Sequence, residues 1–428
     1  MKVLIIGSGG REHSLAWKIA QSANVEAVYV APGNAGTAGE PKIENITIDV
    51  MDFENLANFA KSESITLTIV GPEAPLVDGV VDYFNQRQLP CFGPSAKAAQ
   101  LEGSKAFTKD FLSRHNIPTS SYKTFTEIKA ATTYINQKGA PIVIKADGLA
   151  AGKGVIVAMT NDEAIAAVED MLSGNKFGTA GNRVVIEGFL AGEEASFIAM
   201  VDGNNVLPMA TSQDHKARDD GDLGPNTGGM GAYSPAPVVS DEIYQRIMNQ
   251  VILPTVKGMA TDGNDYTGFL YAGLMISPEG EINVIEFNCR FGDPEAQPVM
   301  LRLKSDLAQL CLAAIDGKLD TQSADWDSRS AVGVVLAAGG YPNSYNKGDV
   351  VSGLPEKPDA DRKVFHAGTT EVNGQIVTNG GRVLCATALG DSVSEAQAAA
   401  YEQVHQIHWD NVYFRSDIAY RAIARENS

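Results

Sequence analysis

Residues 141–155 read Pro-Ile-Val-Ile-Lys-Ala-Asp-Gly-Leu-Ala-Ala-Gly-Lys-Gly-Val. An apolar run that ends in Lys145 leads into a glycine-rich loop, and a second apolar run starts at Val155. This is not a Walker A loop, because aspartate stands at 147, where that motif has its first glycine, and Gly154 replaces the Ser or Thr. The pattern instead predicts a hairpin whose loop closes over phosphates through backbone amides, with Lys145 as a point charge beneath it. A strand-end lysine beside a flexible turn is an equally good interpretation of this stretch alone.

Residues 183–194 predict a strand that runs into an acidic linker. The strand is Arg183–Glu187, and the linker carries Glu193 and Glu194. The backbone at such a strand end can hydrogen-bond the edge of an adenine, and a carboxylate after it can accept hydrogen bonds from ribose hydroxyls. Together with the 141–155 stretch, this linker indicates a nucleotide site in the middle of the chain.

Residues 282–295 place polar side chains on one face of a predicted strand, since alternate residues of a strand share a face. We expect one face to carry Val284, Glu286, Asn288 and Arg290, and the other Ile285, Phe287 and Cys289. Mg²⁺ prefers oxygen ligands and takes only one or two from protein, leaving the rest to phosphates and water. A polar network at a sheet edge is the weaker alternative, because three buried polar groups are unfavourable without a ligand.

The chain opens with an apolar strand followed by Gly7-Ser8-Gly9-Gly10-Arg11 and a helical pattern. The dinucleotide fingerprint G-x-G-x-x-G fails here, because its sixth position is Glu12. The end of the second strand, at residues 29–34, also lacks the acid that would hold a ribose hydroxyl. The glycines and the helix N-terminus can still cradle a phosphate, which Arg11 would help to bind. A tight turn without a ligand is the alternative.

Strands alternate with helices up to about residue 100, which predicts a parallel sheet with a ligand site beyond the carboxyl ends of its strands. Three loops should converge there, at 7–11, 31–37 and 71–76. A second unit begins near Gly103, with Ser104 as a helix N-cap. A third unit ends the chain, and we expect it to pack against and cover the substrate, because we find no catalytic cluster in its sequence.

The predicted elements are the following. We expect strands over 3–6, 27–30, 66–70, 141–145, 155–158, 183–187, 196–201, 269–276, 281–288, 331–338 and 382–388. We expect helices over 11–22, 53–62, 105–115, 162–172, 297–312 and 394–408.

Composition narrows the class of protein. A length of 428 residues allows about three domains. The net charge of -18 argues against a nucleic-acid partner, because the phosphate backbone would be repelled. Four cysteines without paired Cys-x-x-Cys spacing argue against zinc or a disulfide framework and favour the cytoplasm. The sequence has no apolar run long enough for a membrane span, so we expect no membrane partner.

In this order, these elements resemble the ATP-grasp superfamily, and most closely its phosphoribosylamine–glycine ligases. The resemblance spans essentially the whole chain and rests on the motifs Gly7–His13, Val70–Leu76, Leu101–Lys105, Lys145–Gly154, Gln213–Lys216, Gly224–Gly231 and Asn288–Glu295. It implies an α/β fold with an α+β centre. The expected domains are a Rossmann-like (pre-ATP-grasp) domain at 1–103, an ATP-grasp domain at 104–325 with a lid at about 123–193, and an α/β domain at 326–428.

The resemblance also implies a reaction. ATP, glycine and 5-phosphoribosylamine would give glycinamide ribonucleotide, ADP and phosphate through glycyl phosphate, in purine biosynthesis. No protein nucleophile is needed, because phosphorylation turns a poor electrophile into one with a good leaving group. Catalysis would be positioning and charge neutralisation, with Mg²⁺ or Mn²⁺. We expect a monomer whose partners are these small molecules.

The implied site residues fall into four groups. Arg290 and Lys145 would be catalytic, and Glu286 and Asn288 would bind the metal. The ATP-binding residues would be Lys105, Lys145, Gly148, Gly152, Lys153, Gly154, Glu187, Phe189, Leu190, Glu193 and Glu194. The substrate-binding residues would be Gly9, Gly10, Arg11, Glu73, Asp214, Lys216, Thr227, Gly228, Gly229 and Asp293. In this scheme the opening glycine loop holds the 5-phosphate of phosphoribosylamine.

One departure and three alternatives accompany this interpretation. Many superfamily members carry a metal-binding acid on the preceding strand, whereas residues 271–275 offer none. Another ATP-grasp ligase or carboxylase, which activates a different acid, is the first alternative. An NAD-linked oxidoreductase and a non-catalytic nucleotide-binding regulator are the others.

Overall fold

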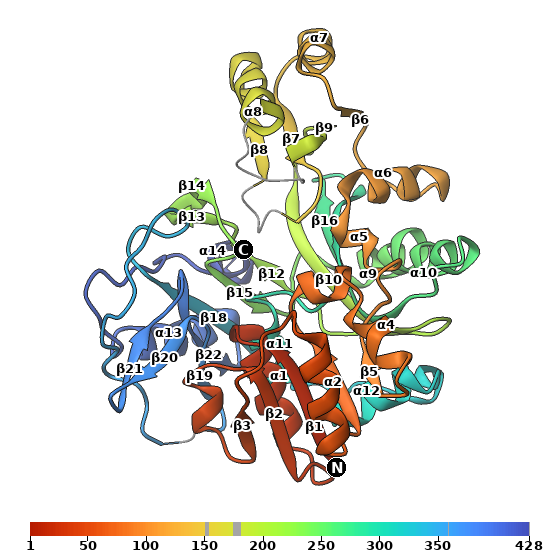
Figure 1. Cartoon of the computed structure of the whole chain (residues 1–428). Coiled ribbons are helices and arrows are strands. Elements are labelled where there is room, and N and C mark those ends of the chain that lie inside the picture. Colours follow the sequence, from red (N-terminus) through yellow and green to blue (C-terminus); the bar gives the residue numbers. More distant parts are fainter. Residues whose placement is uncertain (150–153, 174–180, 358, 428) are drawn as a thin grey trace.

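The computed structural model describes residues 1–149, 154–173, 181–357 and 359–427. The N-terminal part is a parallel sheet with strand order β3-β2-β1-β4-β5, as predicted (Figure 1). Its strands are β1 (Lys2–Gly7), β2 (Ala27–Pro32), β3 (Ile43–Asn45), β4 (Leu67–Val70) and β5 (Cys91–Phe92). Its helices are α1 (Gly10–Ala20), α2 (Phe53–Ser62), α3 (Glu73–Val77), α4 (Val80–Asn85) and α5 (Gln100–Gly103).

The core of this sheet explains why its strands are continuously apolar. Val3 and Ile5 pack into one hydrophobic cluster with helix α1, whereas Leu4 and Ile6 pack into another with helix α2. Both faces of the sheet are therefore covered, as parallel sheets require. The loops after β1, β2 and β4 leave from the same edge.

The lid is a lobe of its own at the top of Figure 1. Its antiparallel sheet has the order β6-β9-β7-β8. Its elements are β6 (Tyr122–Phe125), α7 (Ile128–Lys138), β7 (Ile142–Ala146), β8 (Val155–Ala158), α8 (Asn161–Ser173) and β9 (Val184–Gly188). The two helices bury Ile135 and Val168 against Ile142 and Ile144 of the sheet. The hairpin predicted from residues 141–155 is the β7–β8 pair.

The central sheet is antiparallel, with the order β11-β10-β16-β17. Its strands are β10 (Glu193–Asp202), β11 (Val206–Pro208), β16 (Thr267–Ile276) and β17 (Ile282–Asn288). The helices around it are α6 (Lys105–Arg114), α9 (Asp241–Ile247), α10 (Leu253–Thr261), α11 (Ala296–Arg302) and α12 (Leu307–Ile315). A single π-helical turn, Met248–Ile252, joins α9 to α10. Helices α9 and α10 cover one face of the sheet, and α12 covers the other.

The single helix predicted over 297–312 is wrong, because the chain forms α11 and α12 instead. Leu303 is extended and buried, and Lys304 donates a backbone hydrogen bond to Asp325. The Asp306 side chain then accepts hydrogen bonds from the backbone N–H groups of Ala308 and Gln309 and so caps a new helix. A tertiary contact therefore ends the first helix, and a local cap starts the second.

The C-terminal sheet is antiparallel, with the order β12-β15-β18-β22-β19. Its strands are β12 (Gln213–Asp214), β15 (Gly231–Ser234), β18 (Ser330–Ala337), β19 (Arg362–His366) and β22 (Arg382–Gly390). Helix α13 (Val393–Val404) packs on this sheet, and the chain ends in α14 (Tyr420–Glu426). Two small hairpins are β13 (Ala217–Asp219) with β14 (Leu223–Asn226), and β20 (Thr369–Val372) with β21 (Gln375–Thr378).

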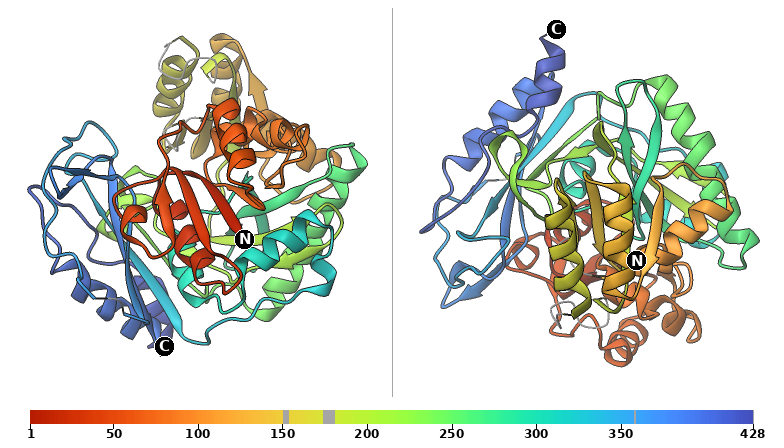
Figure 2. Two further views of the ribbon diagram at one scale, coloured as in Figure 1. Left: turned by 60° about the horizontal axis from the view of Figure 1, so that its bottom comes forward. Right: turned by 90° about the horizontal axis from the view of Figure 1, so that it is seen from above.

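This last sheet crosses the domain boundary that we expected at 325/326, since β12 and β15 precede that boundary and β18 follows it. In Figure 2 (left) the N-terminal part lies in the middle of the view, with the C-terminal part to its left. The central and C-terminal sheets also meet directly, through backbone hydrogen bonds between Ser196 and Ser212. Across the residues that the structure describes, no helix has the length and apolarity needed to cross a membrane.

Candidate functional site

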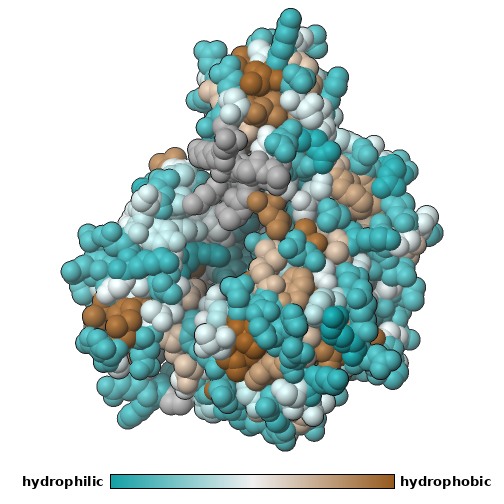
Figure 3. Space-filling model, in the orientation of Figure 1, coloured by the Kyte–Doolittle hydropathy of each residue, from teal (hydrophilic) through white to brown (hydrophobic). Residues whose placement is uncertain are grey.

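A cavity of about 630 Å³ lies where all four parts of the chain meet. Its wall includes Gly9 from the N-terminal sheet, Gly148 from the lid, Glu286 from the central sheet and Arg382 from the C-terminal sheet. In Figure 3 the molecule is hollowed beneath the lid, with hydrophilic residues around the hollow. Its volume lies in the range of small-molecule sites.

Three lysines lie at or beside this cavity: Lys105 and Lys109 of α6 line it, and the buried Lys145 of β7 lies next to them. Lys145 Nζ lies 3.1 Å from a carboxylate oxygen of Glu187, and Lys109 Nζ lies 2.7 Å from the other. Lys105 Nζ donates a hydrogen bond of 3.0 Å to the carbonyl oxygen of Gly148, at the start of the glycine-rich loop. These contacts bring Lys145 of β7, the glycine-rich loop and helix α6 together.

Burial and neighbouring charges together set the pKa values of these lysines and of Glu187. Burial lowers the pKa of Lys109 to about 8 and also lowers the pKa of Lys105. Burial alone would raise the pKa of Glu187, but Lys145 and Lys109 outweigh it and lower that pKa. Glu187 is therefore ionised and bridges the two lysine side chains, so this group keeps an excess of positive charge that suits an anionic ligand.

Asp147 anchors the glycine-rich loop. Its carboxylate accepts a hydrogen bond of 3.0 Å from the backbone N–H of Ala106 and one of 3.1 Å from Ser104 Oγ, at the start of α6. Arg183 Nε donates a third, at 2.7 Å. The next residue, Gly148, has a φ of +109°, which only glycine adopts readily. The loop thus turns at Gly148 toward the lysines.

Glu286, Asn288 and Arg290 all line the larger cavity, as expected. The strict alternation predicted for β17 is wrong, however. The register between β16 and β17 shifts at Gly273/Leu274, so that Ile285 bulges and lines the cavity with Glu286. Val284 lies instead in the core with Phe287 and Cys289. A bulge puts two successive residues on one side and so redirects the strand at its functional end.

The donor set fits a divalent cation. Burial alone would raise the pKa of Glu286, but the charges of Lys216, Lys145 and Lys105 outweigh burial. The pKa is therefore lowered, and the carboxylate is ionised. Glu286 and Asn288 supply two oxygen ligands, which is what Mg²⁺ usually takes from protein beside phosphates and water. Within the described ranges no cluster of three His, Cys, Asp or Glu side chains is placed to hold a metal.

Arg290 is held by two carboxylates of the N-terminal part. Its Nη2 lies 2.9 Å from Glu102 Oε1, and its Nε lies 3.4 Å from Glu73 Oε2. Glu102 also accepts a hydrogen bond of 2.7 Å from the backbone N–H of Cys289. Burial raises the pKa of Glu102 to about 7, against the influence of Arg290. The guanidinium is therefore fixed in place at the cavity wall.

The opening glycine loop is already paired within the protein. Gly9 N–H donates to Glu12 Oε2 at 2.5 Å, and Arg11 N–H donates to Asp293 Oδ2 at 3.2 Å. The Arg11 guanidinium donates to Glu12 at 2.5 Å and to the carbonyl of Phe291 at 3.3 Å. Glu12, Glu73, Glu102 and Asp293 line the cavity here. Carboxylates therefore surround the loop at the cavity, and two of its backbone donors are taken. We call the Gly7–Arg11 loop together with Glu12, Glu73 and Asp293 around it the acidic loop.

A smaller cavity of about 100 Å³ adjoins the first one. Asp214, Lys216, Glu194 and Lys145 line it. Lys216 Nζ donates to Asp214 Oδ2 at 2.7 Å. Burial raises the pKa of Asp214 to about 6, although Lys216 opposes this shift.

Most of the predicted site residues meet at these two cavities. Those that line one or both are Gly9, Arg11, Glu73, Lys105, Lys145, Gly148, Gly154, Glu187, Glu194, Asp214, Lys216, Thr227, Gly228, Glu286, Asn288, Arg290 and Asp293. Those that line neither are Gly10, Phe189, Leu190, Glu193 and Gly229. Gly152 and Lys153 lie outside the described residues.

Close packing explains two of these exceptions. A Cβ on Gly10 would meet Gln297 Nε2 at 2.4 Å, so this glycine lets α1 approach α11. A Cβ on Gly229, which has a φ of +117°, would meet Pro294 at 2.4 Å. Glu193 forms an ion pair with Arg425 of α14.

Several cavity residues were not predicted from the sequence. They are Glu12, Glu102, Lys109, Tyr271, Glu295, Tyr341 and Arg382. Lys109 could have been found, because it follows Lys105 by four residues on one helix and so shares its face. Arg382 had no local signal, and its Nη1 donates to the carbonyls of Gly228 at 2.8 Å and Asp293 at 2.6 Å.

The sequence matches three domains of one family in order along the chain. Residues 1–102 match the N domain of phosphoribosylglycinamide synthetase, residues 103–296 its ATP-grasp (A) domain, and residues 331–421 its C domain. The chain belongs to the phosphoribosylglycinamide synthetase family. It is therefore an ATP-grasp ligase, and the fold and family expected from the sequence are confirmed.

Individual relatives agree with this family. A phosphoribosylamine–glycine ligase of Vibrio parahaemolyticus is 69% identical over 100% of this chain and 99% of the relative. The crystal structure of a phosphoribosylamine–glycine ligase from Thermotoga maritima has a TM-score of 0.85 at 33% identity, covering 98% of this chain and 100% of that one.

A more distant structure shares the fold alone. This is the biotin carboxylase domain of a Hydrogenobacter thermophilus 2-oxoglutarate carboxylase, in complex with MgADP, ADP and bicarbonate. Its TM-score is 0.75 at 13% identity, covering 96% of this chain and 91% of that one.

Proposed function

We propose that the chain ligates glycine to 5-phosphoribosylamine with ATP, forming glycinamide ribonucleotide, ADP and phosphate in purine biosynthesis. ATP first phosphorylates the glycine carboxylate, which is otherwise a poor electrophile. The amine then attacks the carbonyl carbon of glycyl phosphate, the C–N bond forms, the amine gives up a proton, and phosphate leaves. The observation that carries this proposal is a single cavity that joins buried lysines, an oxygen-donor pair and an acidic loop.

At the ATP end, Lys105 and Lys145 neutralise the phosphates, and the loop containing Gly148, Gly152, Lys153 and Gly154 covers them. This proposal is supported by the Lys105–Gly148 contact and by the position of both lysines at the cavities. Glu187, Phe189 and Leu190 form the adenine pocket. Glu194 is a better candidate for the ribose hydroxyls than Glu193, because Glu194 lines a cavity whereas Glu193 pairs with Arg425.

Glu286 and Asn288 hold Mg²⁺ or Mn²⁺ in this proposal. The bound cation would supply charge neutralisation between the phosphates. The ionised state of Glu286 supports the assignment. A likeness of fold to a structure that contains MgADP is consistent with a divalent ion but does not select between the two metals.

Arg290 binds the transferring phosphoryl group and then the acyl phosphate. Glu102 and Glu73 fix its guanidinium before substrate binds, so no reorganisation is needed when charge develops. Asp214 and Lys216 are the contacts of glycine, with Lys216 toward the carboxylate and Asp214 toward the ammonium group. A neighbouring pair of opposite charges suits a zwitterion.

The acidic loop receives the sugar and amine of phosphoribosylamine. Glu12, Glu73 and Asp293 offer acceptors to hydroxyl and amine groups, whereas a phosphate dianion would be repelled there. We therefore assign the phosphate not to the Gly7–Arg11 loop, where the sequence suggested it, but to Arg382 and Tyr341, which also line the cavity. The loop keeps its role as a substrate contact through the ribose.

The proposed site can be assembled within a single chain, so the proposal does not require an oligomer. The four cysteines are free and buried, which fits a reducing cytoplasm.

Phosphate release from ATP tests the reaction. We expect release that requires both glycine and phosphoribosylamine, with glycinamide ribonucleotide detected by mass spectrometry. Release supported by bicarbonate instead of glycine would favour a carboxylase and overturn the proposal. Omitting each substrate in turn provides the control.

A further inference from the structure

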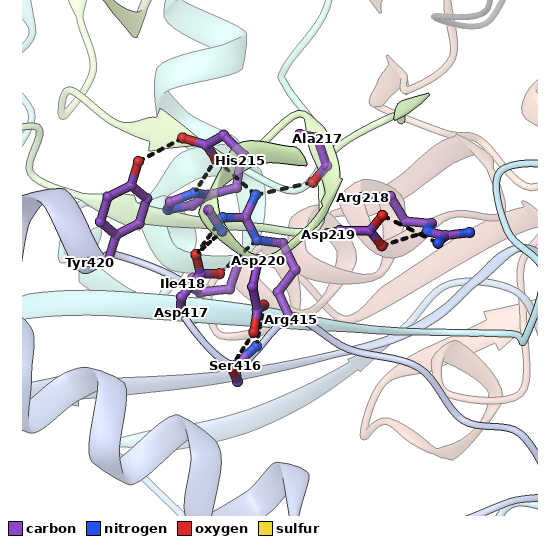
Figure 4. Close-up of polar contacts among 12 residues, drawn as sticks. His215, Ala217, Arg218, Asp219, Asp220, Arg415, Ser416, Asp417, Ile418 and Tyr420 are labelled. Carbon is purple, nitrogen blue, oxygen red and sulfur yellow. Dashed lines mark hydrogen bonds and ion pairs between the residues drawn. The ribbon is translucent and has the colours of Figure 1, made fainter. Parts of the chain in front are cut away.

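A segment near the end of the chain, residues 413–421, forms hydrogen bonds and ion pairs with the hairpin of residues 216–227. This hairpin comprises β13, a short turn and β14. We call residues 413–421 the C-terminal clamp. Arg415 is its centre, with a side chain that is 0% exposed. It donates from Nη1 to Asp222 Oδ1 at 2.9 Å and to the carbonyl of Ala217 at 3.1 Å, and it binds Asp417 with Nε and Nη2 at 2.8 Å each (Figure 4).

The clamp also holds the turn of the hairpin. Ser416 N–H donates to Asp220 Oδ1 at 2.8 Å, and Gly221 N–H donates to Asp417 Oδ2 at 2.7 Å (Figure 4). Tyr413 OH donates to Asp219 Oδ1 at 2.8 Å. Strand β13 and the turn are thus tied to one short segment that lies nearly 200 positions further along the sequence.

A second set of contacts reaches the strand that carries Asp214. His215 Nε2 accepts a hydrogen bond of 2.9 Å from the backbone N–H of Ala419, so this nitrogen carries no proton. Its Nδ1 then bears the proton and faces Asp222 Oδ1 at 3.5 Å. Asp222 also accepts from Tyr420 OH at 2.8 Å. Hydrogen bonds from His215, Tyr420 and Arg415 lower the pKa of Asp222 far below its usual range, despite burial.

The hairpin has little else to order it. All four residues of β14 are exposed, and Leu223 is 67% exposed, so no apolar core of its own holds the hairpin. At its base, Thr227 N–H and Oγ1 donate to the carbonyl of Lys216 at 2.7 and 2.8 Å. The three residues Lys216, Asn226 and Thr227 line both cavities. The base of the hairpin is therefore part of the wall that the two cavities share.

We propose that the C-terminal clamp positions this wall and that Arg415 is a positioning residue for glycine binding through Lys216. Arg415 lines neither cavity, so its effect passes through the hairpin. Only the kinetic test of this inference rests on the proposed function. The order of the hairpin can be measured without any turnover.

The test is Arg415→Met, which keeps the aliphatic packing and removes every hydrogen bond of the guanidinium. We expect the KM for glycine to rise by about tenfold and backbone amides of residues 217–226 to exchange with solvent at least tenfold faster in the ligand-free protein. We expect a smaller rise in the KM for phosphoribosylamine, because Arg382 and Tyr341 bond to Gly228, which follows the hairpin, and not to residues 216–227.

Arg302→Met is the matched control. Arg302 is also buried, donates to the backbone carbonyls of Asp327 and Arg329, and lines neither cavity. It should lose thermal stability but keep hairpin exchange and the KM for glycine. If Arg415→Met does not fold, Tyr413→Phe removes one clamp contact and should show a smaller shift of the same kind.

An unchanged KM for glycine with unchanged hairpin exchange in Arg415→Met would overturn the inference. Equal shifts in the Arg302 control would do the same, since they would reveal a general loss of stability. A wild-type protein without glycine-dependent turnover would instead refute the proposed function, and the exchange measurement would still decide whether the clamp orders the hairpin.

Discussion

The guanidinium of Arg290 lies 2.9 Å from the carboxylate of Glu102, although the two residues belong to different parts of the chain. Arg290 follows the central strand β17, and Glu102 sits in helix α5 beside the parallel sheet. The same carboxylate accepts the backbone N–H of Cys289, so it fixes both the side chain and the backbone beside it. The position of the Arg290 guanidinium is therefore set by the packing of one domain on another.

Glu102→Gln should reduce kcat by about tenfold and leave the KM for ATP nearly unchanged. A charged hydrogen bond contributes about 1.5–3 kcal/mol, and part of it would be lost as Arg290 gains freedom. Steady-state kinetics would measure the split between kcat and KM. Glu54→Gln, at an exposed position of the same domain, is the control. A fall in both variants, or in neither, would contradict a positioning role for Glu102.

Glu286→Ala should abolish turnover and weaken binding of Mn²⁺ in the presence of an ATP analogue. The change removes one of two oxygen donors and one of the negative charges near Lys105, Lys145 and Lys216. Titration calorimetry with the metal provides a readout that does not depend on activity. Full activity in Glu286→Ala would show that the metal assignment is wrong.

Gly9→Ala should raise the KM for phosphoribosylamine by about tenfold. A Cβ at this position would lie 2.8 Å from Glu12 Oε2 and 3.4 Å from Asp293 Oδ2, and would displace the carboxylates of the acidic loop. Its backbone is extended, so the substitution adds no conformational strain. Gly39→Ala, which meets nothing within 4 Å, should behave like the wild type. Equal kinetics for both variants would argue against sugar binding at this loop.

Local sequence patterns were sufficient for the elements whose signal is local. The continuous apolar run of β1 and the Ser104 cap of α6 were both predicted from neighbouring residues. The bulge at Ile285 and the break at Leu303 were not, because each depends on a partner strand or loop elsewhere in the chain. Periodicity alone assumes a regular element and cannot detect where tertiary contacts interrupt it.

The same distinction applies to the site. Glu286, Asn288 and Arg290 lie within one motif and were predicted together, and all three line the cavity. Glu102 and Arg382 reach the site only through folding, and Arg382 contacts the backbone of Asp293 from 89 positions away. The family match recovers the ligase identity, but the pairing of the glycine loop with Glu12 is visible only in the fold.

Arg382→Lys should raise the KM for phosphoribosylamine by about tenfold while the KM for ATP stays within twofold. Lysine keeps the charge but loses the planar fork that contacts the carbonyls of Gly228 and Asp293. Varying each substrate at saturating levels of the others separates the two constants. Lys363→Arg, in the same sheet but not at the cavity, is the matched exchange. A rise in the KM for ATP alone would contradict the proposed phosphate position.

The contact between His13 and His366 predicts acid sensitivity of the folded state. The backbone N–H of His366 donates a hydrogen bond of 2.8 Å to His13 Nδ1. This contact crosses the boundary between the N-terminal and C-terminal sheets. Burial, with the nearby charges of His13 and Lys363, lowers the pKa of His366 to about 3. The unfolded chain takes up this proton near pH 6.5, so stability should decrease as the pH falls from about 6.5 toward 3.

His366→Asn should therefore be less stable than the wild type at pH 7 but lose less stability on acidification. Protonation of one such histidine in the unfolded chain alone would lower the free energy of unfolding by about 2 kcal/mol between pH 7 and pH 5. Urea unfolding at both pH values measures this difference. His408→Asn, at an exposed position, should keep the wild-type slope. Equal slopes in the wild type and His366→Asn would mean that the buried histidine does not govern the acid response.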